Sequence, residues 1–461
     1  MAITTKTSRT ELKSSFIRMD AEFFRPENVS AYKSLDNIDG RYRLGQLCEK
    51  VTQGSNPVFS KSGFPCVNGK NVYFGTMREG EPNYVSEEEF NRLSNFCLRK
   101  DDIVITLKHA TKIGRAWIVV NENPPMIFAR NVGLIRLAKE SSIIPSVLLM
   151  YLWTKFGQLC LDRCATGGTS GQITLPMSEL KRIPIPPFSK KSQTEIDVLY
   201  QESKKSTLIS EESYLKAQRV LETELGLDKL KLKKSENISR YSTIGLTDTF
   251  NAGRIDAQCF APNAVFYEKW LLKHTECIHL NRLLEAKVKG KQQKELEKGS
   301  TDYCSIKHIS GHELIGASKC QPASDTLLAA ANDLLLAITG ATIGKIGIVK
   351  RYNKLAFSGD LLCLKTSSGV DPHYLLAVLD HEIGQTQFNR WITGSTNGHL
   401  SPRDVGRVLV PRLKQSVESR ISDLVEESLQ KRIESEKLLE QAKHRVEQLI
   451  EQAVEGSGEK S

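Results

Sequence analysis

The chain has 461 residues, of which 39% are hydrophobic and 26% are charged, a balance typical of globular proteins rather than disordered or fibrous ones. Its 64 lysine and arginine residues exceed its 54 acidic residues, and the net charge of +10 favours a polyanionic partner. No apolar stretch reaches the roughly 20 residues needed to cross a membrane, and the polar segment Met1–Thr10 lacks the apolar core of a signal peptide. We therefore expect a cytoplasmic protein with no membrane association, whose ten scattered cysteines stay reduced.

Two sequence signatures occur twice, in the same order along the chain. The string RMDAEFF at 18–24 returns as RIDAQCF at 254–260, and TGGTSG at 166–171 returns as TGSTNG at 393–398. Repeats of about 20 to 50 residues build solenoids, whereas these copies are far longer and predict two similar domains. A chain duplicated in this way is expected to engage a partner that also has two parts.

The first part of each copy mixes short apolar runs with glycine, proline and asparagine turns, which is typical of short strands. Apolar residues in 145–160 recur at helical spacing. We expect strands at 103–106, 116–120, 334–338 and 346–349, and single helices at 145–160 and 372–388.

The second part of each copy is rich in charged residues and free of proline and glycine, from Ser189 to Leu225 and from Leu413 to Val454. This composition favours long helices. Apolar residues that step by three and four along one side of each segment predict that the two helices pair, most simply antiparallel. The stepping residues are Leu439, Ala442, Val446 and Leu449 in the last segment and Tyr214, Ala217 and Leu221 in the first.

The order of globular part, long helix, globular part and long helix, with the paired signatures and the strings GRAWIV (114–119) and GKIGIV (344–349), resembles the specificity (S) subunit of type I restriction–modification systems. The resemblance covers nearly the whole chain. It implies an α+β fold with two tandem α/β target-recognition domains, separated and followed by long helices that form an antiparallel coiled coil, and a pseudo-twofold internal repeat. The implied segments are a first target-recognition domain at 1–187, a central helical spacer at 188–230, a second target-recognition domain at 240–411 and a C-terminal helical spacer at 412–455.

The same resemblance implies a non-catalytic subunit that selects a bipartite, asymmetric DNA target for phage defence. Its implied partners are double-stranded DNA, two methyltransferase (M) subunits and, through these, restriction (R) subunits. Each recognition domain would read one half of the target, and the helices would set the spacing between the halves. S-adenosylmethionine, ATP and Mg²⁺ are then expected in the partner subunits, for DNA methylation and restriction, and no cofactor is expected in this chain.

Three strings imitate catalytic or metal-binding motifs, and each has a simpler structural interpretation. The NPPM string at 123–126 lacks the aromatic side chain that would stack on a flipped base in an adenine methyltransferase. The segment 340–346 is one residue short of a phosphate loop. Cys304, His308 and His312 step by four, but the two histidines have no counterpart in the other copy. We therefore expect turns at the first two places, and no catalytic or metal site.

Polar loops at corresponding positions of the two copies are the candidates for DNA reading. Asn and Gln can form bidentate hydrogen bonds with adenine and Lys can reach guanine, while Lys, Ser and Thr also hold phosphates. The loop in which Gln172 corresponds to His399 is the strongest candidate. Its sequence pattern is shared by the two copies while this side chain differs, as two half-sites of different sequence would require. The simpler interpretation is that these loops are polar because they are exposed. The candidates are Gln53, Ser55, Asn56, Lys70, Asn71, Lys108, His109, Thr111, Lys112, Thr169, Ser170, Gln172, Lys291, Gln292, Lys307, His308, Thr339, Thr342, Thr396, Asn397 and His399.

Three alternatives remain open at this point. The chain could be an enzyme with its own methyl-transfer or nuclease activity, or a coiled-coil scaffold whose globular ends bind protein. An S-like DNA-recognition subunit of another defence or modification system is a closer variant, because the difference lies in the partner. The DNA-binding interpretation requires an affinity that falls steeply with added salt, whereas the scaffold requires none.

Overall fold

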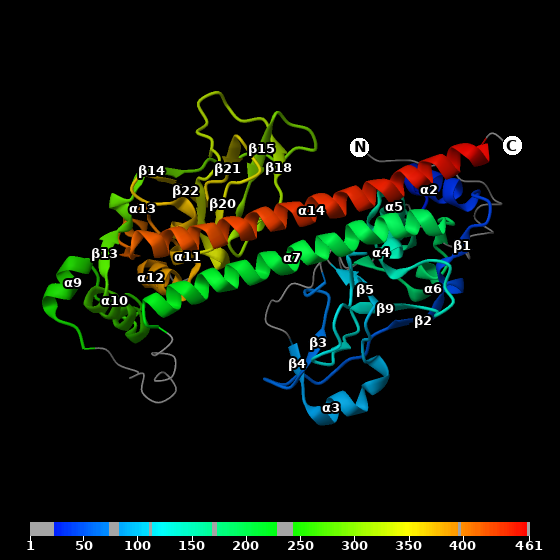
Figure 1. The fold of residues 1–461 in the computed structure, drawn as a ribbon, viewed down its shortest axis with the longest axis horizontal. Helices are drawn as coiled ribbons and strands as arrows, with labels where there is room; N and C mark the ends of the chain where they lie inside the picture. Colours follow the sequence, from blue (N-terminus) through cyan, green and yellow to red (C-terminus); the bar gives the residue numbers. More distant parts are fainter. Residues whose placement is uncertain are drawn as a thin grey trace. The chain divides into compact units, whose positions relative to one another are not determined.

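The structure is a computed structural model that describes residues 23–72, 83–109, 113–167, 173–227, 243–394 and 398–458. The chain divides into two compact units, the first made of 1–205 with 434–461 and the second of 206–433. Each unit contains a globular body and one piece of each long helix, α7 (Lys190–Glu224) and α14 (Gln415–Gly458) (Figure 1). The expected mixture of strands and helices is confirmed. No helix within the described ranges is long and apolar enough to cross a membrane.

The body of the first unit consists of short strands and helices, and the predicted strand at 103–106 is confirmed as β5. The strands are β1 (Tyr42–Arg43), β2 (Cys48–Gln53), β3 (Phe64–Val67), β4 (Asn83–Val85), β5 (Ile103–Thr106), β6 (Lys108–His109), β7 (Ala116–Ile118), β8 (Ile127–Phe128), β9 (Val132–Leu137), β10 (Thr166–Gly167), β11 (Ile173–Thr174) and β12 (Pro184–Ile185). The helices are α2 (Pro26–Asp36), α3 (Glu87–Arg92), α4 (Pro145–Trp153), α5 (Lys155–Cys164) and α6 (Met177–Leu180), with short 3₁₀ turns at Leu44–Gln46 and Ser94–Phe96.

The body of the second unit has a similar set of elements, and the predicted strands at 334–338 and 346–349 are confirmed as β19 and β20. The strands are β13 (Glu276–His279), β14 (Leu284–Lys289), β15 (Thr301–Cys304), β16 (Ile309–Ser310), β17 (Glu313–Leu314), β18 (Ser318–Cys320), β19 (Leu334–Ala337), β20 (Ile346–Ile348), β21 (Leu355–Phe357), β22 (Leu361–Thr366) and β23 (Leu409–Arg412). The helices are α9 (Leu246–Ala252), α10 (Pro262–His274), α11 (Pro372–Asp380), α12 (Glu382–Trp391) and α13 (Pro402–Val405), with 3₁₀ turns at Leu280–Arg282, Ile306–His308 and Gly340–Thr342.

The main sheets of the two units have matching strand orders. The four-stranded antiparallel sheet is β2-β9-β5-β7 in the first unit and β14-β22-β19-β20 in the second. The three-stranded sheet is β4-β3-β8 in the first unit and β18-β15-β21 in the second, and each contains one parallel and one antiparallel pair. Fully buried side chains of β5 and β19 show that each strand lies at the centre of its core.

The predicted helical ranges 145–160 and 372–388 are helical, but each is broken in two, which the sequence did not predict. The first breaks at Thr154, whose extended backbone precedes α5 and whose hydroxyl accepts a hydrogen bond from the amide of Gly157. A Cβ atom on Gly157 would lie 2.2 Å from a carbonyl oxygen of α4, so the chain bends where only glycine fits. His381 caps α12 in a similar way. In both cases the helix is interrupted at a residue that caps the next helix. The spacing of apolar residues along the sequence does not show such an interruption.

Within each unit, α7 and α14 lie side by side and run in opposite directions (Figure 1). Side chains that meet across the pair have rising numbers on one helix and falling numbers on the other. Buried serines form two of these contacts, and their small size lets the two helices approach closely. The contacts are Ser203–Ser435 and Glu195–Arg445 in the first unit, and Ser210–Ser428 and Ser213–Glu427 in the second.

The apolar stripes of the long helices contribute to the core of each unit, rather than only to the contact between the helices. Full burial of one large aliphatic side chain stabilises a protein by roughly 1.5–3 kcal/mol, so each stripe helps to hold its body. The buried stripe residues are Ala442 and Val446 in the core of the first unit, and Tyr214, Ala217 and Leu221 in the core of the second.

The signature at 254–260 holds the C-terminal end of α12 in the second unit. The guanidinium of Arg254 donates to both carboxylate oxygens of Asp256, at 2.7 and 2.8 Å. It also donates to two carbonyl oxygens at the end of α12, at 3.4 and 3.2 Å. Carbonyls in the last turn of a helix have no partner within the helix, so the signature supplies one. The matching residues at 18–22 lie outside the described residues.

Burial of His312 links the stability of the second unit to pH. Its imidazole stacks on the ring of Tyr214, with centroids 3.4 Å apart, and burial lowers its pKa to about 4. The pKa of histidine in an unfolded chain is about 6.5, so between these values the unfolded chain binds more protons. Stability that is fully present above pH 6.5 is therefore lost as the pH falls toward 4. Asp380 has the opposite effect, because burial raises its pKa and its proton is retained in the folded state.

We expect the free energy of unfolding to fall by about 3 kcal/mol or less between pH 6.5 and 4 through His312, given about 1.4 kcal/mol for each unit of pKa difference. Replacing His312 by phenylalanine keeps the ring on Tyr214 but removes the titration, so this part of the slope should disappear. Urea unfolding at a series of pH values measures the difference. Equal slopes in the two proteins would contradict the assignment.

Candidate nucleic-acid interface

The ends of three strands meet at one edge of the four-stranded sheet in the first unit. Both β2 and β5 run antiparallel to β9, so their last residues lie beside its first ones. Gln53 pairs with Gly133 and Thr106 pairs with Val132. The loops that follow β2 and β5, and the turn that precedes β9, therefore lie together. We call residues 53–56, 107–109 and 129–131 the first loop edge.

The second unit has a corresponding edge, formed by the same arrangement of strands. Lys289 at the end of β14 pairs with Leu362, and Ala337 at the end of β19 pairs with Leu361. The turn before β22 lies beside both loops. We call residues 289–292, 338–340 and 358–360 the second loop edge.

The turn at 129–131 joins the loops of the first loop edge, and no residue of this turn was among the candidates from sequence. The side-chain amide of Gln53 donates to the carbonyl oxygen of Arg130 at 2.6 Å. The backbone amide of Leu107 donates to the carbonyl oxygen of Asn131 at 2.9 Å. Because both loops are bound to this turn, it is the structural centre of the edge. The turn has no motif of its own, and only the pairing of β9 with two strands places it there.

A glycine in each unit lets the first loop of the edge lie directly on the turn. A Cβ atom on Gly54 would lie 2.4 Å from the carbonyl oxygen of Ala129, and one on Gly290 would lie 2.1 Å from that of Ser358. Real Cβ atoms do not approach an oxygen this closely, so both positions require glycine. The two loop edges therefore share a backbone frame, while the residues that follow the glycines differ: Ser55 and Asn56 in one, Lys291 and Gln292 in the other.

Apart from Asn71, the described candidates of the first unit lie in three environments. Asn56 and Lys70 are exposed. Gln53 is held by the turn, and Ser55 is half-buried and forms a β-bridge with the same turn. Lys108 and His109 form β6, which pairs with β11. Thr111, Lys112, Thr169, Ser170 and Gln172 lie outside the described residues.

Asn71 has a structural role and is not available to a ligand. Its side chain is buried, with 4% of the residue exposed, and its carboxamide oxygen accepts a hydrogen bond from the backbone amide of Asn68 at 3.1 Å. The backbone amide of Asn71 in turn donates to the carbonyl oxygen of Asn68. Its polarity therefore serves the turn that places Lys70 at the surface, a use that the sequence did not distinguish from DNA reading.

Two lysine candidates of the second unit are held in ion pairs. Lys291 lies 2.8 Å from Asp325, and Lys307 lies 2.6 Å from Glu295. The Lys307 ammonium lowers the pKa of Glu295, and Lys291 lowers the pKa of Asp325, so both carboxylates are charged at neutral pH. Exposed pairs of this kind stabilise proteins little, but they reduce the positive charge that the second unit presents.

Two of the remaining described candidates of the second unit, Thr339 and His308, take part in local hydrogen bonds. The hydroxyl of Thr339 donates to Asp360 at 2.6 Å, within the second loop edge. Burial lowers the pKa of His308, whose Nδ1 accepts from the backbone amide of Ser305 at 3.0 Å. The buried hydroxyl of Thr342 has no hydrogen-bond partner among the described residues. Gln292 is exposed.

In the loop that is the strongest candidate from sequence, His399 does not correspond to Gln172 as expected. The amide of Leu175 donates to the carbonyl oxygen of Leu107, and the amide of Leu400 donates to that of Ile338. His399 therefore corresponds to Thr174 of β11 and not to Gln172, because the loop before it is shorter in the second unit. Thr396 and Asn397, at the tip of this loop, lie outside the described residues.

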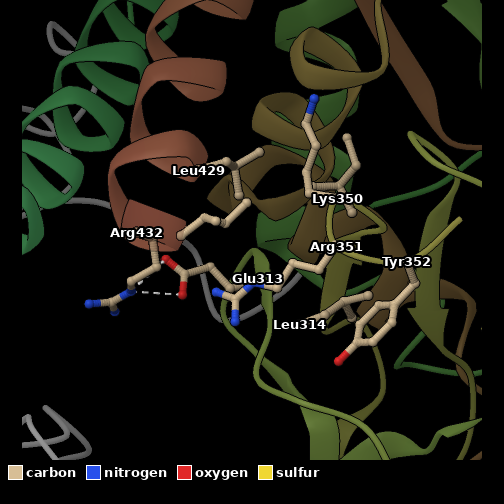
Figure 2. Close-up of a pocket in the computed structure, with 9 residues that line it drawn as sticks. Glu313, Leu314, Lys350, Arg351, Tyr352, Leu429 and Arg432 are labelled. Atoms are coloured by element: carbon tan, nitrogen blue, oxygen red, sulfur yellow. Dashed lines mark hydrogen bonds and ion pairs between the residues drawn. The ribbon is translucent and has the colours of Figure 1, made fainter. Parts of the chain in front are cut away.

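A small, partly open pocket in the second unit lies between α14 and the end of β20, and none of the DNA-reading candidates lines it (Figure 2). Arg432 of α14 donates to both carboxylate oxygens of Glu313, at 3.1 and 2.9 Å. Lys350 and Arg351 line the same pocket. The Glu313 carboxylate is nearly buried, so this ion pair fixes the β16–β17 hairpin to α14.

No protein-family model matches the chain, and no curated protein matches it. Among solved structures, it is similar to the type I restriction–modification S subunit from M. genitalium, with 14% identity and a TM-score of 0.44 over 91% of this chain and 96% of that one. It is also similar to the HsdS subunit from Thermoanaerobacter tengcongensis, with 12% identity and a TM-score of 0.29 over 90% and 95%. The type IIG restriction endonuclease BpuSI matches 41% of this chain and 30% of its own length, with 13% identity and a TM-score of 0.31. Similarities this low do not establish a function, so we infer the function from the chain's own residues.

Proposed function

We propose that the chain is the DNA-specificity subunit of a type I restriction–modification complex and reads a bipartite, asymmetric target. The observation that carries this proposal is the pair of loop edges. Gly54 and Gly290 hold the same backbone frame in both units, while the side chains that follow them differ. Two loop edges with the same backbone geometry but different side chains are suited to recognise two half-sites of different sequence. Two identical loop edges would instead suit a palindromic target.

The matched sheets support an internal repeat with pseudo-twofold symmetry, and the paired helices support an antiparallel coiled coil. At about 1.5 Å per residue, the 35 residues of α7 extend for about 50 Å. One turn of DNA is about 34–36 Å long. We propose that the helices act as a spacer between two readers that bind half-sites about one turn apart.

The proposal assigns no chemical step to this chain. The helix pair would dock two M subunits, and R subunits would join through these. S-adenosylmethionine, ATP and Mg²⁺ would be bound by the partners, and an M subunit would flip an adenine out of each half-site for methylation. The complex would act in the cytoplasm, where it meets phage DNA.

The test is duplex-DNA binding by the purified full-length chain, alone and with its M subunits, across a series of salt concentrations. We expect the logarithm of the association constant to fall linearly with the logarithm of the salt concentration, since bound phosphates release counterions. Selection from a randomised duplex library should return two short motifs with a fixed gap. Absence of salt-sensitive binding would favour the protein scaffold. Unaided cleavage, or binding of S-adenosylmethionine by the chain alone, would favour an enzyme.

The ion pair between Glu295 and Lys307 in the second unit predicts that removing its carboxylate strengthens DNA binding. Replacing Glu295 by glutamine frees Lys307 and removes a negative charge, so we expect affinity to rise by about two- to five-fold at low salt. Replacing Glu297 by glutamine is the matched control, because this exposed residue removes the same charge without an ion pair among the described residues. Titrations of labelled duplex DNA measure both. An equal gain in the two variants would show that Lys307 itself plays no part.

A further inference from the structure

Arg130 is the tip of the turn that joins the loops of the first loop edge. Its side chain is exposed, and its guanidinium forms no hydrogen bond or ion pair with any described residue. Lys70, on a neighbouring loop, and Lys108, in β6, also form no ion pair within the described ranges. Arg130 and Lys108 of the first loop edge, and Lys70 beside it, are therefore cations without an ion pair among the described residues, whereas Lys291 and Lys307 of the second unit are paired.

The backbone of this turn is fixed from several sides. The amide of Val132 donates to the carbonyl oxygen of Ala129 at 3.0 Å and closes the turn. The Gln53 side chain holds the carbonyl oxygen of Arg130 at 2.6 Å. A side chain that projects from a fixed turn loses less backbone entropy on binding than one on a free loop. The backbone of Arg130 is therefore already ordered before any ligand binds.

Three buried polar atoms without a hydrogen-bond partner in the described part of the chain lie around the same turn. Ser55 Oγ, Asn68 Nδ2 and Asn131 Oδ1 are buried without a partner among the described residues. The amide of Ala129 donates to the carbonyl oxygen of Val67, which places Asn68 next to the turn. Buried polar atoms without partners are few in folded proteins, and each calls for an explanation such as water, an ion or a functional role. A site that binds a polar ligand explains why these three occur together.

We propose that Arg130 is a specificity-determining residue of the first unit and contacts the edge of a guanine in the major groove. This inference rests on the proposed function. Arginine donates two parallel hydrogen bonds to O6 and N7 of guanine, which is the commonest base-specific contact of proteins with DNA. Lys70, on a neighbouring loop, and Lys108, in β6, lie near this turn and are suited to the adjacent phosphates.

The second unit cannot make the same contact. The amide of Ser358 donates to the carbonyl oxygen of Cys304, as that of Ala129 does to Val67 in the first unit, so the two turns correspond. Arg130 then corresponds to Gly359, which has no side chain. The guanine contact therefore belongs to the first half-site alone.

The experiment compares full-length wild type with Arg130→Gln and Arg130→Lys in selections from a randomised duplex DNA library. We expect the glutamine variant to lose the preference for guanine at one position of one half-site, with the other half-site unchanged. Discrimination at that position should fall by roughly 5- to 150-fold, the size of one bidentate base contact. Lysine, which also reaches guanine, should retain part of the preference.

Lys139→Gln is the matched control, because Lys139 is exposed beyond the opposite end of β9 and carries the same charge. If Arg130→Gln weakens binding to all sequences equally and lowers the salt slope by about one, Arg130 holds a phosphate and the inference is wrong. Unchanged selection by Arg130→Gln would also overturn it. A wild-type chain that selects no sequence would instead contradict the proposed function, so the two failures are distinguishable.

Discussion

Exchange of residues 1–187 for the corresponding segment of a chain with the same architecture and a known target should change one half of the recognised DNA sequence. The other half should stay as it was. The physical reason is that every residue of the first loop edge, 53–56, 107–109 and 129–131, comes from this segment. The second loop edge, 289–292, 338–340 and 358–360, lies wholly in the other unit.

The exchanged body must still fit the helices that complete its core. Ile196 and Tyr200 of α7 and Ala442, Val446 and Ile450 of α14 are buried in the core of the first unit. The incoming segment should therefore keep apolar side chains of similar size where it meets these five residues. Thermal unfolding of the exchanged chain checks this fit before any DNA is added.

Methylome sequencing of cells that express the exchanged chain with the proposed M subunits gives the new target directly. The reciprocal exchange of residues 240–411 is the control and should change only the opposite half. A target that changes in both halves, or in neither, would show that reading is not divided between the units. The effect is large because recognition of a half-site is replaced as a whole.

Duplication of one heptad in each long helix should lengthen the gap between the half-sites and leave the half-sites themselves unchanged. Repeating 203–209 in α7 and 429–435 in α14 restores every serine contact of the pair, because Ser210 still meets Ser428 and Ser203 still meets Ser435. The inserted serines then meet each other. Seven residues add about 10 Å of helix, which corresponds to about three base pairs.

A chain with the heptad repeated in α7 alone is the matched control. Its serines lose their partners on α14, so we expect a less stable chain rather than a longer gap. Selection from a randomised library measures the gap in each protein. An unchanged gap in the doubly extended chain, with both half-sites still recognised, would contradict the role of the helices as a spacer.

The local elements of this protein were largely predictable because their signals are local. Apolar runs at 103–106 and 334–338 gave buried strands, and two charged segments without proline or glycine gave the long helices α7 and α14. Duplicated signatures predicted two similar bodies, and the matched strand orders agree with that expectation. Each of these signals depends on neighbouring residues in the chain.

The candidate site was less predictable, because burial and partners decide which polar residues are free. Asn71 and Lys70 are adjacent and both polar, yet one is buried in a turn and the other is exposed. Lys291 and Lys108 are both lysines at candidate positions. Lys291, however, forms an ion pair with Asp325, which lies more than thirty residues further along the chain. Correspondence by signature also misplaced His399, since two residues of difference in loop length are visible only in the hydrogen bonds of the strands.

The sequence by itself therefore determined that strands and helices are mixed, that two signatures recur and which loops carry polar residues, since composition and periodicity act through neighbours along the chain. Tertiary structure decided which of those loops come together. The antiparallel pairing of β9 with β2 and β5 brings 53–56, 107–109 and 129–131 to one edge. Arg130 lies at the centre of that edge because of pairings between strands far apart in the sequence, and no pattern near residue 130 indicates them.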